Sequence, residues 1–196
     1  MFRLIIMLLC FVSFSTFADV FSGTDADAKL PFWEWRSENV SIRLVQRLPD
    51  QSRAYFVARN FTTEQAELIA QSCVFQTIFK NIAAPGQAQE IRYDLSEWIV
   101  ISAGHKQGLI TRQDWQTIWK TKNVAQAARI AFEWSLLPTR HHYQPGDFNW
   151  GMTLYGLSPG ARFDLQLVWY ENDEQKKALI ADVECAADIH PDPESE

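Results

Sequence analysis

Two cysteines far apart in the sequence constrain this 196-residue chain more than any other feature. Cys10 lies in an N-terminal export segment, described below, which leaves Cys73 and Cys185. An even number of cysteines in an oxidising compartment is most simply one disulfide. This bond would close a loop of 113 residues, for which the chain-entropy model gives about 4 to 5 kcal/mol of stabilisation. A redox-active pair or two thiolate metal ligands are the alternatives, and the lack of a C-x-x-C motif weakens both.

The N-terminal segment, MFRLIIMLLCFVSFSTFA, has the pattern of a secretory signal peptide. One cation, Arg3, precedes an apolar run from Leu4 to Val12, and Thr16 and Ala18 supply small residues before the cleavage point. The apolar run is shorter than the roughly 20 residues of a spanning helix, which favours cleavage near Ala18 over an uncleaved anchor. We therefore predict a periplasmic or secreted protein that is not an integral membrane protein after cleavage.

The 178 residues after position 18 carry 17 Lys and Arg against 24 Asp and Glu, a net charge of −7. This length is typical of one domain with a full core. The basic residues form no cluster, and nucleic acids and anionic membranes both select basic patches, so we expect neither as a partner. Acidic residues are concentrated in 187–196, which we predict to be a solvated tail.

The spacing of apolar residues predicts a single α+β domain over 40–186, in which two helical pairs pack on antiparallel strands and one disulfide staples the fold. Helical periods predict pairs at 49–61 with 62–73 and at 111–122 with 124–135. Alternating or β-branched patterns predict strands at 40–46, at 162–170 and 178–186 as a hairpin, and a strand pair within 74–102 around Pro85-Gly86. Residues 19–39 are predicted to be a loose N-terminal leader.

Finer features of these patterns also predict local structure. Thr62 and Gln65 form a capping box between the first two helices, and Asn60 is placed for a left-handed helix end. In the last strand, alternation places Leu179, Ala181 and Val183 together on one face.

Eight tryptophans are the second unusual feature of the composition. Five lie on periodic apolar faces and are predicted to be buried, namely Trp98, Trp115, Trp119, Trp134 and Trp169. Trp33, Trp35 and Trp150 have polar, irregular neighbours and are candidates for exposed rings that bind a sugar, a peptide or a partner protein. The alternative is that these three rings anchor loops onto a sheet.

The segment TRHHYQPGDFNWGMTLYG, residues 139–156, is predicted to be a long exposed loop on a rigid scaffold, as functional loops often are. Trp150, Tyr143 and Asp147 in this loop are candidate contacts for a partner. Together with Trp33 and Trp35, they form the binding residues that the sequence suggests.

Three residues of the same segment, His141, His142 and Met152, are a candidate copper site. Imidazole and thioether ligands in an exported protein favour copper over zinc or calcium. Adjacent histidines on a strand point to opposite faces, so this site requires a loop or a bent backbone. The alternative is that both histidines are solvated loop residues. Copper is the one possible cofactor, and otherwise we expect none.

The sequence contains no catalytic motif with the neighbouring residues that its chemistry needs. GLSPG at 156–160 matches the G-x-S-x-G nucleophile elbow, but Pro159 follows the serine and has no N–H to donate to an oxyanion. The segment is better explained as a turn between two strands. The sequence contains no phosphate-binding loop of the G-x-x-x-x-G-K-[ST] type.

These observations together predict a non-catalytic, exported binding or accessory protein. It would present the 139–156 loop and nearby aromatic residues to an envelope protein or a small ligand. The alternative is a copper-binding or copper-delivery protein that uses His141, His142 and Met152.

Overall fold

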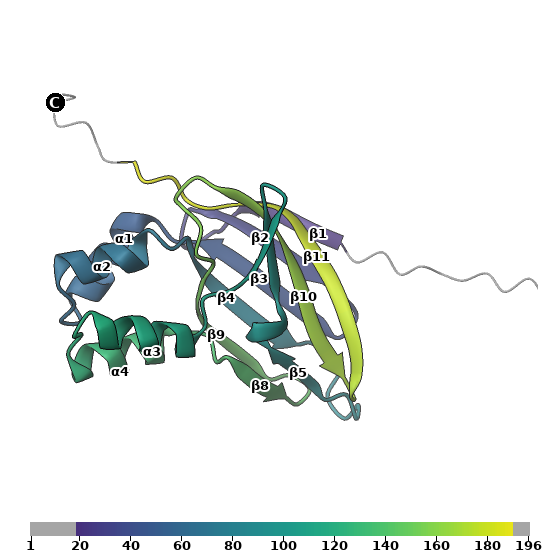
Figure 1. Cartoon of the computed structure of the whole chain (residues 1–196). Helices are drawn as coiled ribbons and strands as arrows, with labels where there is room; N and C mark the ends of the chain where they lie inside the picture. The colour runs from purple at the N-terminus through teal and green to yellow at the C-terminus, as the bar shows by residue number, and fades with distance from the viewer. Residues whose placement is uncertain (1–18, 190–196) are drawn as a thin grey trace, which may run out of the picture.

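The computed structural model describes residues 19–189 and consists of two antiparallel β-sheets with four α-helices grouped at one side (Figure 1). The predicted α+β class is therefore confirmed. The predicted signal peptide, 1–18, lies outside the described residues, as do residues 190–196 of the predicted acidic tail.

The first sheet has five strands, in the spatial order β1-β2-β3-β4-β9, and every neighbouring pair is antiparallel. Its strands are β1 (Asp19–Thr24), β2 (Pro31–Arg36), β3 (Val40–Gln46), β4 (Val74–Asn81) and β9 (Phe148–Leu154). The predicted strand at 40–46 is β3, whose alternate residues Val40, Ile42 and Leu44 are all buried.

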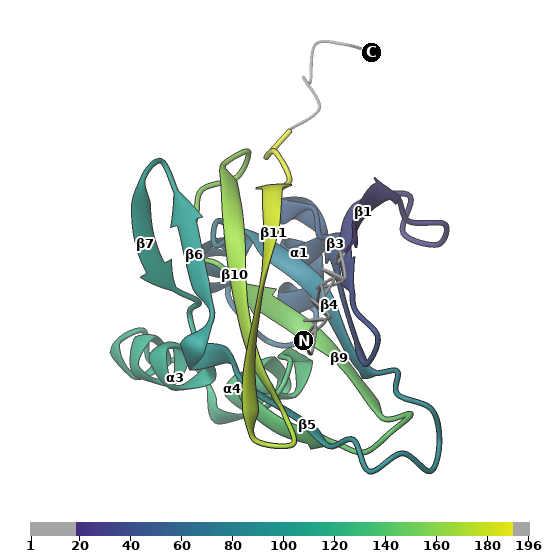
Figure 2. The same ribbon diagram turned by 90° about the vertical axis from the view of Figure 1, so that its right-hand side faces the viewer.

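The second sheet is built around one long strand, β10. Its strands are β5 (Ile91–Asp94), β6 (Ile99–Ser102), β7 (His105–Gly108), β8 (Arg140–Tyr143), β10 (Arg162–Glu171) and β11 (Glu174–Glu184). One edge of β10 pairs with β11, and the other pairs first with β6 and then with β5. The short 3-10 helix η1 (Leu95–Glu97) separates β5 from β6. Figure 2 shows the strands of this sheet crossing those of the first.

A hydrophobic core fills the space between the two sheets. Its aromatic contacts cross from one sheet to the other, as between Trp35 of β2 and Trp169 of β10, whose ring centroids lie 4.8 Å apart. Leu165, Leu167 and Ile180 supply fully buried aliphatic side chains from the second sheet. Residues that alternate along a strand point to opposite faces of the sheet, so every second side chain, such as Leu165 and Leu167, faces this core.

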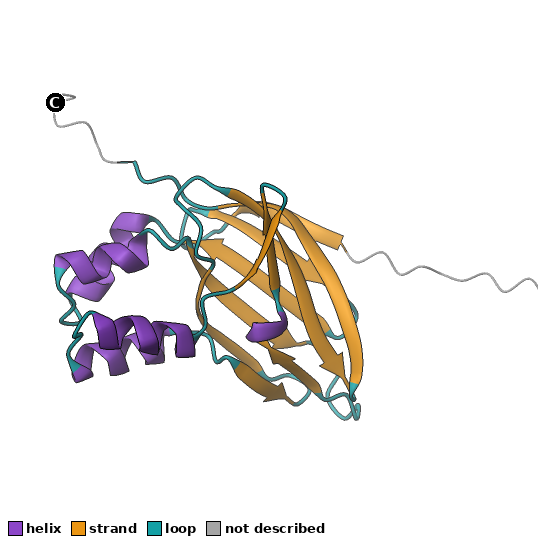
Figure 3. Cartoon of the chain, in the orientation of Figure 1, coloured by secondary structure: helices purple, strands orange, loops and turns teal. Residues whose placement is uncertain are grey.

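The helices are two insertions into the strand order, and both helical pairs were predicted (Figure 3). The first insertion, between β3 and β4, holds α1 (Pro49–Val57) and α2 (Thr63–Ala70). The second, between β7 and β8, holds α3 (Arg112–Thr121) and α4 (Gln126–Ser135). The capping box is present, since Thr62 Oγ1 accepts from the Gln65 N–H at 3.2 Å. Asn60 has the predicted positive φ, at 65°.

A second core joins the helices to the first sheet. The rings of Phe56, Phe61, Trp119 and Phe132 pack against one another at centroid distances of 5.3 to 6.2 Å. Val74, Met152 and Leu154 contribute from β4 and β9. On β4, Phe75 and Phe79 face the core between the sheets, while Val74 at the start of the strand faces the helices. Further along the outer face, Gln76 and Ile78 are half-buried and Lys80 is exposed.

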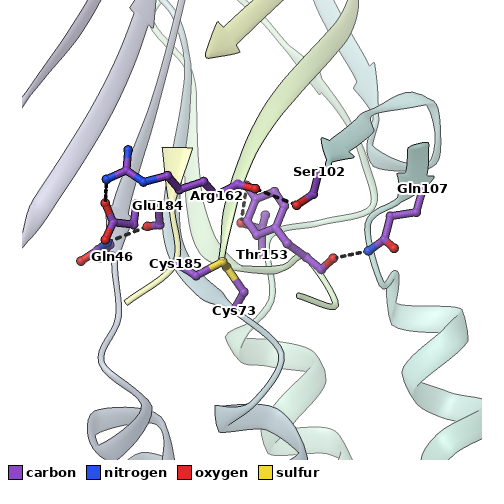
Figure 4. The surroundings of a disulfide bond; sticks show 9 residues. Gln46, Cys73, Ser102, Gln107, Thr153, Arg162, Glu184 and Cys185 are labelled. Carbon is purple, nitrogen blue, oxygen red and sulfur yellow. Dashed lines mark hydrogen bonds and ion pairs between the residues drawn. A yellow bond between two sulfur atoms is a disulfide. The ribbon is translucent and has the colours of Figure 1, made fainter. Parts of the chain in front are cut away.

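The disulfide between Cys73 and Cys185 is present, as predicted, with a Cα–Cα distance of 5.3 Å (Figure 4). Cys73 directly precedes β4, and Cys185 directly follows β11. The bond therefore connects the first sheet to the second at the side where the helices begin. Gln46 Nε2 donates to the Glu184 carbonyl at 2.6 Å beside it and makes a second link between the sheets.

The segment 19–39, which the sequence predicts to be a loose leader, instead forms β1 and β2. Trp35 is buried in the core and Trp33 packs edge-on against Phe75, so neither ring is the freely exposed one that the sequence suggests. β1 is an edge strand, and most of its side chains are exposed. Its sequence therefore lacks the alternation of apolar and polar residues by which a strand is predicted.

Three further expectations differ from the structure. The strands predicted within 74–102 do not pair with each other, because β4 belongs to the first sheet and β5 to the second. In β11, Ile180 and Val183 are buried while Leu179 is 47% exposed, because a bulge at Asp182 (φ 53°) interrupts the alternation. The predicted tail begins in contact with the helices, since Arg53 Nη2 donates to Asp188 Oδ2 at 2.6 Å.

The disulfide gives the first testable prediction. Replacing both cysteines, Cys73→Ser with Cys185→Ser, should lower the free energy of unfolding by about 2 to 5 kcal/mol, because the unfolded chain regains the freedom that the bond removes. Urea unfolding monitored by tryptophan fluorescence measures the change. Wild-type protein unfolded in reductant is the control and should match the double variant. An unchanged urea midpoint would contradict the prediction.

Gly151 gives the second prediction, because the backbone of residues 136–137 crosses directly over it. A Cβ at Gly151 would lie 2.2 Å from the Leu137 nitrogen, beside the hydrogen bond from that N–H to the Met152 carbonyl. Gly151→Ala should therefore destabilise the protein by about 1 to 3 kcal/mol in urea unfolding. Gly108→Ala is the matched control, since its added Cβ meets no atom within 4 Å. Equal stability of the two variants would refute this interpretation.

Candidate functional site

The segment 139–156 is not the long loop that the sequence predicts. Arg140–Tyr143 forms β8, Phe148–Leu154 forms β9, and four turn residues join them. β8 pairs with β5 in the second sheet and β9 with β4 in the first, so the segment connects the two sheets. Asp147 Oδ2 accepts from the Gln144 N–H at 2.9 Å and so stabilises the turn.

GLSPG at 156–160 lies between β9 and β10, as predicted for a turn between strands. Gly156 and Gly160 both have positive φ, at 66° and 76°. A strand follows the serine where a nucleophile elbow would have a helix.

The three candidate copper ligands lie in different environments. His141 packs against the ring of Tyr143 at 4.6 Å, whereas His142 is on the opposite face of β8, with Nδ1 2.8 Å from Glu90 Oε1. Met152 is only 4% exposed and belongs to the core beneath the helices. Within residues 19–189, no group of three or more His, Cys, Asp or Glu side chains is arranged to hold a metal ion.

The candidate binding residues separate in the same way. The Tyr143 ring is fully buried and stacks on Phe79 at 5.0 Å, and burial raises the pKa of Tyr143 to about 12. Its ring therefore offers no surface to a partner. Asp147 is exposed, but its carboxylate accepts the hydrogen bond from Gln144 that stabilises the turn. Trp150, in contrast, is 66% exposed on β9 and remains available for contact, as does the neighbouring Phe148.

The exposure of Trp134 differs most clearly from the prediction. The spacing of apolar residues predicts a buried ring, yet Trp134 is 88% exposed at the end of α4. Apolar residues lie on both sides of this helix. Ala128 and Phe132 face the core, while the residues at i, i+3, i+4 and i+7 form a second stripe, Ala127, Ile130, Ala131 and Trp134. A helix with two apolar stripes cannot turn both toward one core, and this pattern in the sequence was the sign that one stripe would be exposed.

The second stripe borders an open groove of about 390 Å³ between α1 and α4. We call this the α1–α4 groove, and its residues are Tyr55, Arg59, Ala127, Ile130, Ala131, Trp134 and Ser135. The Tyr55 hydroxyl and Ser135 Oγ lie 2.9 Å apart and connect the two helices by a hydrogen bond.

Two guanidinium groups lie over the ring of Tyr55. The guanidinium carbon of Arg59 is 3.3 Å from the ring centroid, and that of Arg47 is 5.6 Å from it. Neither arginine forms an ion pair with a carboxylate in the described part of the chain. Arg47 Nε is buried and has no hydrogen-bond acceptor among residues 19–189. Burial lowers the pKa of Arg47, and the nearby positive charge of Arg59 acts in the same direction.

A second surface pocket, of about 220 Å³, is lined by charged residues at the far end of β10 and β11. Its residues are Glu90, Arg92, His142, Asn172 and Asp173. Here the charges are already paired, since His142 contacts Glu90 at 2.8 Å and Arg92 contacts Asp173 at 3.2 Å. This pocket differs from the α1–α4 groove, whose cation, Arg59, has no carboxylate partner among residues 19–189.

Comparison with known proteins adds no functional assignment, since no family model, curated protein or solved structure matches this chain. None of the helices within residues 19–189 is long and apolar enough to cross a membrane.

Titration with Cu⁺ and Cu²⁺ tests whether the three candidate ligands act together. Because Met152 is buried apart from both histidines, Met152→Leu should leave the copper affinity of the protein unchanged in isothermal titration calorimetry. The volume of the side chain is nearly conserved, so the fold should tolerate this change. His141→Ala with His142→Ala is the comparison. A loss of about tenfold or more in both variants would mean that the three residues share one ion.

Proposed function

We propose that this protein is an exported, non-catalytic binding protein that docks on a partner protein of the cell envelope through the α1–α4 groove. The observation that carries the proposal is the exposure of Trp134, which is 88% exposed beside a groove that also contains Tyr55 and Arg59. Tryptophan, tyrosine and arginine are the residue types that dominate the binding energy of protein interfaces. The three side chains thus form a candidate anchor.

The rigidity of α4 supports this proposal. Its buried face is held by Phe132, whose ring lies 5.2 Å from that of Trp115 and 5.3 Å from that of Trp119. A surface that is ordered before binding loses less conformational entropy on association. The sequence suggested 139–156 as the binding surface, but most of that segment is strand and core. Trp150 and Phe148 remain as a second exposed aromatic site.

The groove chemistry favours binding over catalysis. Among the described residues, no histidine or carboxylate lines the α1–α4 groove, so it lacks an acid–base pair. The hydroxyl of Ser135 donates to the Ala131 carbonyl at 2.8 Å and is not paired with a base. The copper alternative has no comparable support, because its three ligands do not converge.

Export is supported by two independent features. The first 18 residues have the pattern of a signal peptide. The Cys73–Cys185 disulfide is a bond that persists in oxidising compartments such as the periplasm or the extracellular space.

Trp134→Ala tests the docking proposal. Crosslinked pull-down from the envelope of the source cell identifies the partner, and calorimetry with the purified partner then measures affinity. We expect Trp134→Ala to weaken binding by about 30-fold or more, the effect of an anchor residue worth about 2 kcal/mol. Because the ring is 88% exposed, the urea midpoint should not change.

Trp150→Ala is the matched control, since it removes an equally large ring that is 66% exposed on another element. We expect it to change the affinity less than threefold. A partner that binds Trp134→Ala as tightly as wild type would overturn the proposal. Recovery of nothing above background would count against it as well.

A further inference from the structure

We infer that the α1–α4 groove recognises an acidic peptide segment, in which a carboxylate lies next to a large apolar side chain. This inference rests on the proposed function and specifies the partner that the groove would take. The occupant is a segment of another protein, with its carboxylate at Arg47 and Arg59 and its apolar side chain against Ile130 and Trp134.

Among residues 19–189, Arg47 and Arg59 belong to the five arginines without a carboxylate partner, the others being Arg36, Arg112 and Arg129. The protein as a whole is acidic, with a net charge of −6, and several of its arginines are surrounded by carboxylates. Arg43 pairs with Asp25 and Glu34, and Arg53 pairs with three acidic groups. Arg47 and Arg59 instead both lie against the ring of Tyr55, and neither has a carboxylate partner among residues 19–189. Arg59 Nη1 donates to the Tyr55 carbonyl at 2.9 Å.

A carboxylate bound at this place would supply the anionic partner that Arg47 and Arg59 lack. Two neighbouring guanidinium groups repel each other, and a partly buried cation without an anionic partner is unfavourable. Arg47 Nε is a buried donor with no acceptor in the described chain, as are Arg112 Nε and Arg129 Nε. Guanidinium groups bind carboxylates with paired, charge-assisted hydrogen bonds, so an acidic side chain is the complementary ligand.

Cations also flank the other side of α4. A neighbouring open pocket of about 230 Å³ shares Ile130 with the groove and contains Lys120 and Arg129. Its single acidic residue, Glu133, accepts from Gln116 Nε2 at 3.0 Å. The apolar stripe that ends in Trp134 therefore has positive charge on both sides. A peptide segment lying across α4 would be complementary to this surface if an apolar residue in the segment lay between acidic ones.

The shape of the site favours a peptide over a membrane surface. Basic and aromatic residues together are also the pattern that binds anionic lipids. A bilayer, however, requires a convex or flat surface with outward-pointing cations. Here Arg47 and Arg59 are both partly buried and their guanidinium groups lie against the ring of Tyr55, so neither projects outward as an anionic lipid surface requires.

The test uses random peptides of about 12 residues displayed on phage and selected on the disulfide-bonded protein without its first 18 residues. Parallel selection on Trp134→Ala identifies the peptides that depend on the groove. We expect these peptides to be enriched in Asp and Glu next to Trp, Phe or Leu. Synthetic copies are then measured by fluorescence anisotropy, each beside a version with every Asp and Glu replaced by Asn and Gln. The neutral versions should bind about tenfold more weakly or worse.

Arginine variants provide the reciprocal measurement. Arg59→Gln, and Arg47→Gln with Arg59→Gln, should each weaken the acidic peptides about tenfold or more but leave the weak binding of the neutral versions unchanged. Arg36→Gln is the control, because it removes the same charge from an exposed position on β2. It should change affinity less than twofold. The comparison of acidic with neutral peptides needs no change in the protein, so it holds even if an arginine variant fails to fold.

The outcomes separate the two claims. If no peptide is selected in a manner that depends on Trp134, both the proposed function and this inference fail. If such peptides are selected but show no acidic preference and bind the arginine variants normally, the inference fails and the proposed function stands. Vesicles containing about one third phosphatidylglycerol are the last probe. Trp134-dependent binding to these vesicles, without peptide binding, would replace the inferred partner with a membrane.

Discussion

The position of β4, which contributes to both hydrophobic cores, is the constraint on which the rest of the structure depends. Phe75 and Phe79 on one face require a second sheet, and Val74 on the other face requires the helices. A strand with apolar residues on both faces needs cover on both sides. Here β10 and its neighbours provide one layer and α1 to α4 the other. Cys73, at the start of this strand, then joins the first layer to the second through Cys185.

The position of the α1–α4 groove follows from this arrangement. Packing the inner face of α4 against Trp115 and Trp119 leaves its outer stripe without a partner in the described structure. The same packing holds α1 alongside, so that Tyr55 and Ser135 connect the two helices. An exposed aromatic residue next to unpaired cations is therefore a property of a rigid scaffold.

Local structure was predictable wherever it depends on neighbours in the sequence. The left-handed residue Asn60 follows the end of α1, and the capping box at Thr62 begins α2. Both depend on contacts within a few residues. Strand pairing was not predictable in the same way, and β4 and β5 ended in different sheets because pairing depends on distant segments. The bulge at Asp182 likewise changed which residues of β11 are buried. Trp134 was misplaced because either apolar stripe of α4 could have faced the core.

The sequence by itself determined the two helical pairs, the strands β3, β10 and β11, the disulfide, and the turn at 156–160, because each depends on local geometry or on simple pairing of two cysteines. It did not determine β1, β2, β8 and β9, whose residues it assigned to a leader and a loop. Only the tertiary structure decided which aromatic residues are exposed and which ligands converge. His141, His142 and Met152 are close in sequence, yet the turn between β8 and β9 sends them to different sheets. Tyr55 and Trp134 are distant in sequence but line one groove, because helix packing brings α1 and α4 together. Arg47 does not line the groove and reaches it only through the ring of Tyr55.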